Sequence, residues 1–198
     1  MNEFPWYIEV TTQDPITQGD FIDECPVLVF KGIPELSDLS DMRSLIEALQ
    51  RSSGIEMARA IVMTQACDIA WKHIRNVILC PIYDLEVYKK AWEEKQLKGG
   101  SKLTDHSWKA EVKKVKEGTK WNLAMLDKRE TSEKSELSIP YQIVDFHEVF
   151  SIPLDFLQVW IQSKNTNRLR LLPPYREHLS QAFARFFMRV GLPNDINI

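Results

Sequence analysis

The amino-acid sequence predicts an α+β protein in which a small, strongly bent sheet or barrel carries a helical insertion and a C-terminal helix. Three observations lead to this prediction. The apolar runs at 59–63 and 76–82 have the length and the β-branched content of strands. The lysine-rich residues 85–118 have the spacing of helices, and residues 173–191 carry an apolar stripe with helical periodicity.

The composition is that of one domain of ordinary size, which we expect to span residues 1–198. Apolar residues make up 44% of the chain and charged residues 27%, as in soluble globular domains. The formal net charge of −3 excludes a domain that is basic throughout, but it allows a local basic patch.

The sequence has no pattern typical of secretion or membrane insertion. Its first residues lack the basic segment and the long apolar core of a signal peptide. No run approaches the roughly 20 apolar residues that a spanning helix requires. The three cysteines are odd in number and have no paired spacing. We therefore expect a reduced, cytoplasmic protein with no membrane partner.

Barrel strands are expected within residues 18–84 and 119–150. The first is predicted over 25–30, where apolar and β-branched residues follow a turn. Apolar residues at helical spacing over 42–49 then predict a helix, with Ser40 as its N-cap.

The two best strand candidates, 59–63 and 76–82, are separated by about a dozen residues. This connection is longer than a tight hairpin needs. Further strands are expected at 121–126 and 141–146, after the helical insertion over 85–118.

The helical insertion is a basic part of the chain. Ten lysines and six acidic residues give residues 85–121 a local charge of about +4. Gly99-Gly100-Ser101 is expected to separate two helices, the second with Trp108 on its apolar face. Tryptophans among these lysines could stack on bases beside phosphate-binding cations. Core packing of Trp108 beneath a solvated lysine face explains the same pattern without a ligand.

The C-terminal helix, expected over 173–191, carries polar residues opposite its apolar stripe. Guanidinium groups at such spacing suit phosphate or carboxylate ligands. A solvated helix face explains the same residues without a ligand. The candidates for ligand binding are His178, Gln181, Arg185 and Arg189, with Arg168 and Arg170 just upstream.

The connection between the two central strands carries reactive side chains. Cys67, Asp68, His73 and Cys80 suggest zinc, but structural zinc sites use four ligands in close pairs, and the two cysteines lie thirteen positions apart. We therefore predict no metal site and no cofactor. Cys67 is also a candidate nucleophile with a histidine as its base, whereas Asp68 suits hydrogen bonds to the backbone of a turn.

Three of these segments together resemble the PemK/MazF-type toxins, which are bacterial endoribonucleases. The residues "GDFI" at 19–22 are similar to the first strand of that family, and 77–82 are similar to its third. In the second strand the matching residues are Arg59, Val62 and Gln65, with Ala60 in place of the usual proline.

The resemblance implies an SH3-like barrel and a phosphate-stabilising role for Arg59. In the family this arginine acts together with a Thr or Ser that follows the third strand. Here Tyr83 and Asp84 stand at those positions, so the sequence departs from the catalytic pattern.

We therefore predict a non-catalytic binding or regulatory module for RNA or another phosphate-bearing ligand. Its expected face combines Arg59, the loop from Gln65 to His73 and the basic edge Arg185–Arg189. The alternative is an endoribonuclease in which Asp68 or His73 activates the ribose 2′-OH while Arg59 stabilises the pentavalent phosphate. A Cys67-dependent enzyme is a third hypothesis, and a protein partner or homodimer stays open.

Overall fold

The structure is a computed structural model that describes residues 4–32, 41–131 and 137–188. Within these residues the strands are β1 (Tyr7–Val10), β2 (Phe21–Phe30), β3 (Ser53–Val62), β4 (Asn76–Asp84), β5 (Leu123–Leu126), β6 (Gln142–Asp145), β7 (Phe150–Pro153) and β8 (Arg168–Leu171). The helices are α1 (Met42–Ser52), α2 (Ala66–Ala70), α3 (Leu85–Lys98), α4 (Asp105–Lys116), α5 (Leu154–Lys164) and α6 (Tyr175–Phe187).

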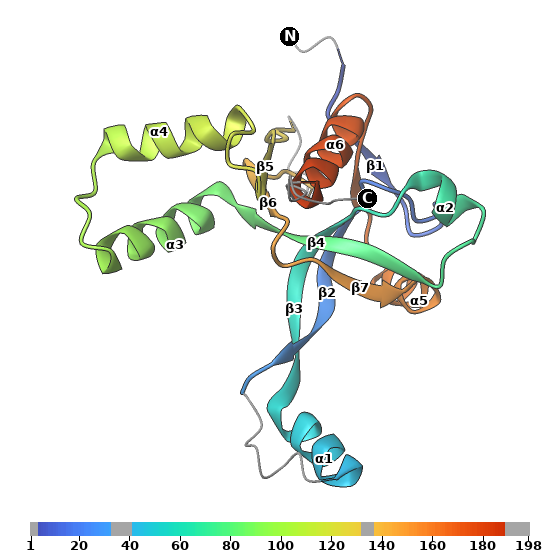
Figure 1. Ribbon diagram of the computed structural model, residues 1–198. Helices are drawn as coiled ribbons and strands as arrows, with labels where there is room; N and C mark the ends of the chain where they lie inside the picture. The colour runs from blue at the N-terminus through green and yellow to red at the C-terminus, as the bar shows by residue number, and fades with distance from the viewer. Residues whose placement is uncertain (1–3, 33–40, 132–136, 189–198) are drawn as a thin grey trace, which may run out of the picture.

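The strands form two antiparallel sheets (Figure 1). The larger sheet has the order β2-β3-β4-β6-β5, and β7 pairs with the first half of β4. The smaller sheet pairs β1 with β8, which come from opposite ends of the chain. The mixed α+β class is therefore confirmed. Among the described residues neither sheet closes on itself, so the SH3-like barrel stays a prediction.

β4 and the helical insertion form where the sequence predicts them, whereas β3 begins at Ser53, six residues before the predicted start. β3 and β4 pair through residues 60–62 and 79–81. The insertion consists of α3 and α4, and Gly100 between them adopts a φ of +73°. Asp41 caps α1 by accepting hydrogen bonds from two backbone N–H groups, whereas the predicted cap, Ser40, lies outside the described residues.

Some elements have no counterpart in the sequence prediction. β1 and β8 lie outside the ranges predicted to hold the strands, 18–84 and 119–150. Three of the four residues of β7 also lie outside these ranges. Each has only four residues, which is too short to show a periodicity. Their backbone N–H and C=O groups form hydrogen bonds with strands distant in the sequence, and a local pattern does not show such partners.

Both faces of the large sheet are buried at its centre, where β3 pairs with β4. Because side chains alternate along a strand, Ile61 of β3 packs with Phe146 and Leu171 in one cluster, beneath α6 and the β1–β8 sheet. Val62 packs on the other face in a second cluster, which includes Leu157 of α5. A sheet covered on both faces requires continuous apolar strands, and β3 and β4 have them.

A buried carboxylate joins the two sheets. Asp20, directly before β2, is fully buried and forms ion pairs with two arginines of β8. Its oxygens lie 2.9 Å from Arg168 Nε and 2.5 Å from Arg170 Nε. The Arg168 guanidinium also donates to the carbonyl oxygens of Thr11 and Asp14. Both arginines therefore serve the fold, and the suggestion that they extend a ligand-binding cluster on α6 is corrected.

We expect Asp20→Asn to lower the free energy of unfolding by about 3–5 kcal/mol, because it leaves two largely buried guanidinium groups without a counter-ion. Urea denaturation of the variant and the wild type measures this difference. Glu47→Gln is the control, since Glu47 pairs with Arg43 on the exposed surface of α1. Exposed pairs contribute about 0–1 kcal/mol. A loss for Asp20→Asn as small as that of the control contradicts the prediction.

Candidate functional site

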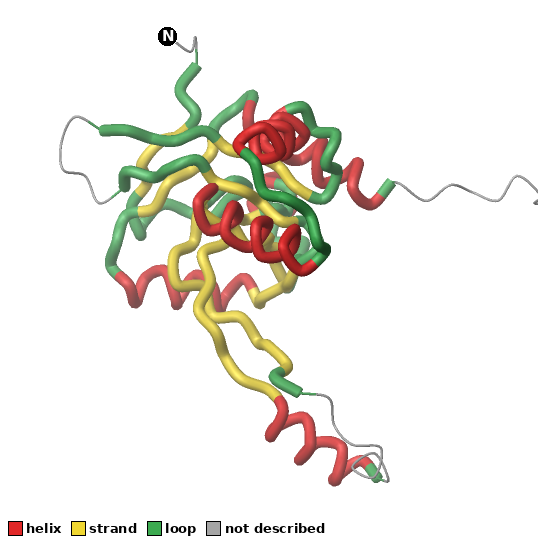
Figure 2. Tube along the Cα trace, turned by 90° about the vertical axis from the view of Figure 1, so that its left-hand side faces the viewer, coloured by secondary structure: helices red, strands yellow, loops and turns green. Residues whose placement is uncertain are grey.

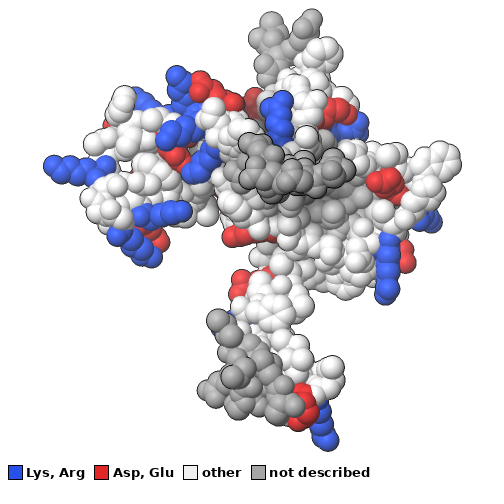
Figure 3. Space-filling model, viewed as in Figure 1, with Lys and Arg blue, Asp and Glu red and all other residues white. Residues whose placement is uncertain are grey.

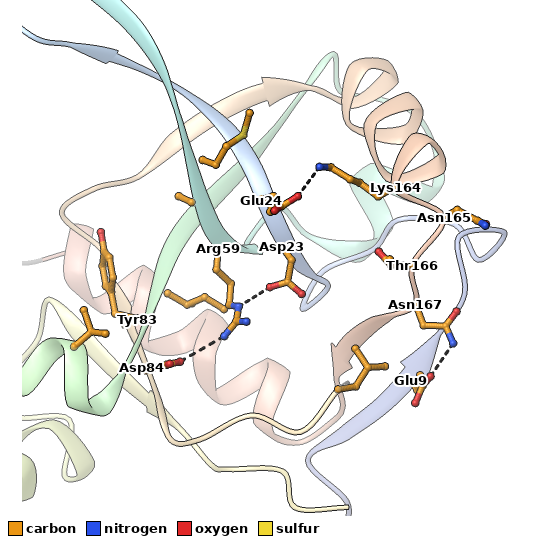
Figure 4. Close-up of a pocket in the computed structure, with 15 residues that line it drawn as sticks. Glu9, Asp23, Glu24, Arg59, Tyr83, Asp84, Lys164, Asn165, Thr166 and Asn167 are labelled. Atoms are coloured by element: carbon orange, nitrogen blue, oxygen red, sulfur yellow. Dashed lines mark hydrogen bonds and ion pairs between the residues drawn. The ribbon is translucent and has the colours of Figure 1, made fainter. Parts of the chain in front are cut away.

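A pocket of about 970 Å³ opens beside Arg59 (Figure 4). Arg59 lies on β3, opposite an irregularity in the pairing of β2 between Ile22 and Cys25. In this bulge Glu24 adopts a left-handed φ of 49°. Two consecutive acidic residues, Asp23 and Glu24, therefore lie opposite the single residue Arg59 of β3. The charged side chains that line the pocket are Glu9, Asp23, Glu24, Arg59, Asp84 and Lys164.

The Arg59 guanidinium is held between two carboxylates. Arg59 Nε lies 2.5 Å from Asp23 Oδ1, and Arg59 Nη1 lies 3.4 Å from Asp84 Oδ1. Asp84 Oδ1 also accepts a hydrogen bond of 2.7 Å from the buried side chain of Gln142 on β6. Arg59 is thereby oriented by groups from three strands and has acidic partners already.

The electrostatics of this pocket oppose a phosphate. Four carboxylates line it against two basic groups, and Lys164, the second base, lies 2.5 Å from Glu24. The hydrogen bond and the charge of Lys164 lower the pKa of Glu24, so this carboxylate is ionised at neutral pH. A phosphate beside Arg59 would have to displace Asp23 or Asp84 and face the remaining acids. The geometry therefore favours a structural role for Arg59.

The candidate residues of the β3–β4 connection lie elsewhere. Gln65 precedes α2 and makes no side-chain cap, while Cys67 and Asp68 lie on α2 and His73 follows it. None of these four residues lines the Arg59 pocket. A general base must come within hydrogen-bond reach of the reacting group, so the structure does not bring Asp68 or His73 to Arg59 as the nuclease hypothesis requires.

The exposed thiol of Cys67 has Asp68 as its hydrogen-bond partner among the described residues, at 3.8 Å from Sγ to Oδ1. Asp68 also turns the backbone, because its carbonyl oxygen accepts a hydrogen bond from His73 N. Across residues 4–32, 41–131 and 137–188, no group of three or more His, Cys, Asp or Glu side chains is arranged to hold a metal ion.

A second surface brings aromatic rings and cations together between α6 and the α4–β5 connection. Three adjoining pockets there have volumes of about 240, 430 and 370 Å³ and share lining residues. We call this surface the aromatic groove and define it by Trp6, Lys116, Trp121, Tyr141, Tyr175, His178 and Arg185; two acidic residues, Glu117 and Asp127, also line it.

The rings of the aromatic groove come from four separate parts of the chain. Trp6 and Tyr175 stack with their centroids 3.7 Å apart. Trp121 is 49% exposed and Tyr141 is 40% exposed, so both present ring surface to solvent. Lys128 Nζ lies 5.9 Å from the centre of the Tyr141 ring, within the range of a cation–π contact.

Two of the predicted ligand-binding residues belong to this groove. His178 and Arg185 lie two turns apart on α6, and both are exposed. Gln181 between them is also exposed, whereas Arg189 lies outside the described residues. Trp6, Tyr141 and Tyr175 were missed by the sequence analysis. No local pattern links them, because Tyr175 is the first residue of α6 and only the fold brings Trp6 and Tyr141 to it.

The basic helices α3 and α4 adjoin the aromatic groove, since Lys116 is the last residue of α4. Figure 3 shows lysine side chains gathered over these two helices. A small network fixes them to the start of β5: Glu111 accepts a hydrogen bond of 2.5 Å from Tyr88 and pairs with Lys120. Burial alone would raise the pKa of Glu111, but the hydrogen bonds from Lys120 and Tyr88 and nearby lysine charges lower it.

Among the three cysteines, we expect only Cys67 to react with a thiol reagent in the native protein at pH 8. Burial raises the pKa of Cys25 and of Cys80 to about 12, with Asp145 adding to the shift at Cys80, so both stay protonated and covered. Mass spectrometry should count one label on the native chain and three in denaturant. Cys67→Ser should remove the native label. Rapid native labelling at a second cysteine contradicts the prediction.

Comparison with known proteins adds no assignment to this geometry. No family model and no curated protein matches the sequence. The resemblance of three strands to the PemK/MazF-type toxins therefore stays a prediction. In the parts of the chain that the structure describes, no helix has the length and apolar character needed to cross a bilayer.

Proposed function

We propose that the protein is a non-catalytic, cytoplasmic module that binds single-stranded RNA. The observation that carries this proposal is the convergence of two exposed rings, Trp121 and Tyr141, and the partly buried Trp6–Tyr175 stack with cationic side chains in the aromatic groove. This groove lies beside the lysine-rich helices α3 and α4. Proteins that bind single strands combine ring surfaces for stacking with a positively charged track for the backbone. The groove offers both within one continuous surface.

The distribution of charge supports this surface as the one that faces RNA. The chain has a net charge of −3, yet residues 85–121 carry about +4, so the remainder is acidic. A polyanion is attracted to regions of positive electrostatic potential. RNA should therefore bind on the α3–α4 side and not at the acidic pocket around Arg59. Lys116 and Arg185 line the groove itself, where they can neutralise phosphates next to a stacked base.

The surroundings of Arg59 support a non-catalytic role. The endoribonuclease alternative needs an arginine that is available to a phosphate, and here the guanidinium is paired with Asp23 and Asp84. One observation keeps this alternative open to test, because Tyr83, at the position of the usual Thr or Ser, lines the same pocket. The consecutive pairing of β2, β3 and β4 is compatible with a distant SH3-like relationship. A Cys67-dependent enzyme has less support, since the hydrogen-bond partner of the thiol among the described residues is the Asp68 carboxylate and not a histidine.

We expect Trp121→Ala to weaken binding of a fluorescent single-stranded RNA about tenfold, because one stacked base contributes roughly 1–3 kcal/mol. Fluorescence anisotropy at fixed salt measures the dissociation constant. Trp71→Ala is the matched control, since Trp71 is 74% exposed but lies after α2, outside the groove. Equal losses for the two variants contradict a specific role of the groove.

We also expect Lys116→Glu combined with Arg185→Glu to flatten the salt dependence of RNA binding. Each lost phosphate contact should reduce the slope of log K against log salt by about 0.7 for a single strand. Arg75→Glu, at an exposed position before β4, serves as the charge control.

Arg59→Ala should leave affinity unchanged, and wild-type protein should leave the RNA intact. RNA cleavage that disappears in Arg59→Ala would establish the nuclease alternative instead.

A further inference from the structure

The outer halves of β2 and β3 form an arm that projects from the body of the protein (Figures 1 and 2). In this arm residues 26–30 pair with residues 53–57, and α1 lies at its tip. β4 pairs with β3 only at residues 60–62, so the arm is a two-stranded ribbon without a third strand among the described residues. An isolated two-stranded ribbon is marginally stable in water, and an additional packed surface stabilises it.

One face of the arm is apolar and exposed. Residues opposite each other in an antiparallel pair share a face, as do alternate residues of one strand. The register therefore places six uncharged residues together: Pro26, Leu28, Phe30, Ser53, Ile55 and Met57. Leu28, Phe30, Ile55 and Met57 are each between 56% and 63% exposed. Contiguous apolar patches of this kind mark interaction surfaces.

We propose that this face is a homodimer interface, in which the arms of two copies of the chain stack face to face about a two-fold axis. The register makes the face self-complementary. Leu28 and Ile55 form its centre, the large side chains of Phe30 and Met57 occupy one diagonal, and the small residues Pro26 and Ser53 occupy the other.

A two-fold axis in the plane of the interface exchanges these diagonals. Whether the axis runs along the ribbon or across it, Phe30 and Met57 of one copy come to lie over Pro26 and Ser53 of the other. Large side chains thus meet small ones throughout, which is the shape that an isologous contact requires. The face has no charged residue, so two negatively charged copies meet without like charges at the centre.

The area of the face sets the strength of the dimer. Four half-exposed side chains present a patch of a few hundred Å², whereas a standard interface takes about 800 Å² from each partner. Helix α1 at the tip of the arm also exposes two apolar side chains, Met42 and Ile46. The dimer should accordingly form and dissociate with protein concentration.

Sedimentation velocity of the full-length protein over a concentration series tests this proposal. Wild-type protein should shift from the 23.1 kDa of one chain to twice that mass as concentration rises. The double variant Leu28→Thr, Ile55→Thr should raise the dimer dissociation constant at least tenfold, because it removes the apolar centre while the β-branched threonines keep the strand propensity. Ile8→Thr on β1 is the matched control, since Ile8 is an exposed strand isoleucine outside the arm.

Three results would overturn the proposal. The first is wild-type protein that remains a monomer at every concentration, which would mean that the face serves another partner or none. The second is a dimer that the double variant leaves unchanged, which would place the contact elsewhere. The third is an equal loss for Ile8→Thr. Circular dichroism and thermal unfolding confirm that each variant is folded. Leu28→Lys provides a second variant in which charge repulsion, with the ribbon otherwise intact, separates the copies.

Discussion

The ion pairs of Asp20 hold together parts of the chain that no local interaction connects. Asp20 is fully buried, and its two arginine partners lie on β8, almost at the other end of the sequence. The preceding residue, Gly19, adopts a φ of +85°, and an added Cβ would come within 3.0 Å of the Leu171 carbonyl oxygen. Gly19 N donates a hydrogen bond to the Val62 carbonyl oxygen, and the Gly19 carbonyl oxygen accepts one from Leu171 N. This Gly-Asp step therefore joins the start of β2 to β3 and β8, and β8 in turn carries the chain into α6.

β4 links the fold to both candidate sites. Its first half pairs with β7, its middle with β3 and its end with β6, and β2 and β5 join the sheet through β3 and β6. Asp84, the last residue of β4, accepts from Arg59 and Gln142, and α3 begins at the next residue. The position of the basic helices is thereby set by the same strand end that keeps Arg59 neutralised.

The contrast between the two surfaces shows why residue type alone does not define a phosphate site. Arg59 occupies the position that a nuclease resemblance assigns to catalysis, but the bulge of β2 supplies it with Asp23. Arg168 and Arg170 are likewise engaged by a buried carboxylate. Lys116 and Arg185 instead line a groove whose other walls are mainly aromatic and apolar. Availability of a cation depends on its neighbours, and these are set by long-range packing.

The elements that could be predicted from the sequence are those with a local pattern. The apolar runs of β3 and β4 are readable because both faces of this sheet are buried, and the glycine break and apolar spacing of 85–118 are sufficient to predict α3 and α4. Of the candidate site, His178 and Arg185 could be identified from their spacing along one helix, and Lys116 and Trp121 from the tryptophans among the lysines of 85–121. The β1–β8 pair, the partners of Arg59 and the contact of Trp6 and Tyr141 with the start of α6 arise only in the folded chain. These features are contacts between distant segments, and their geometry has no periodicity along the chain from which it could be predicted.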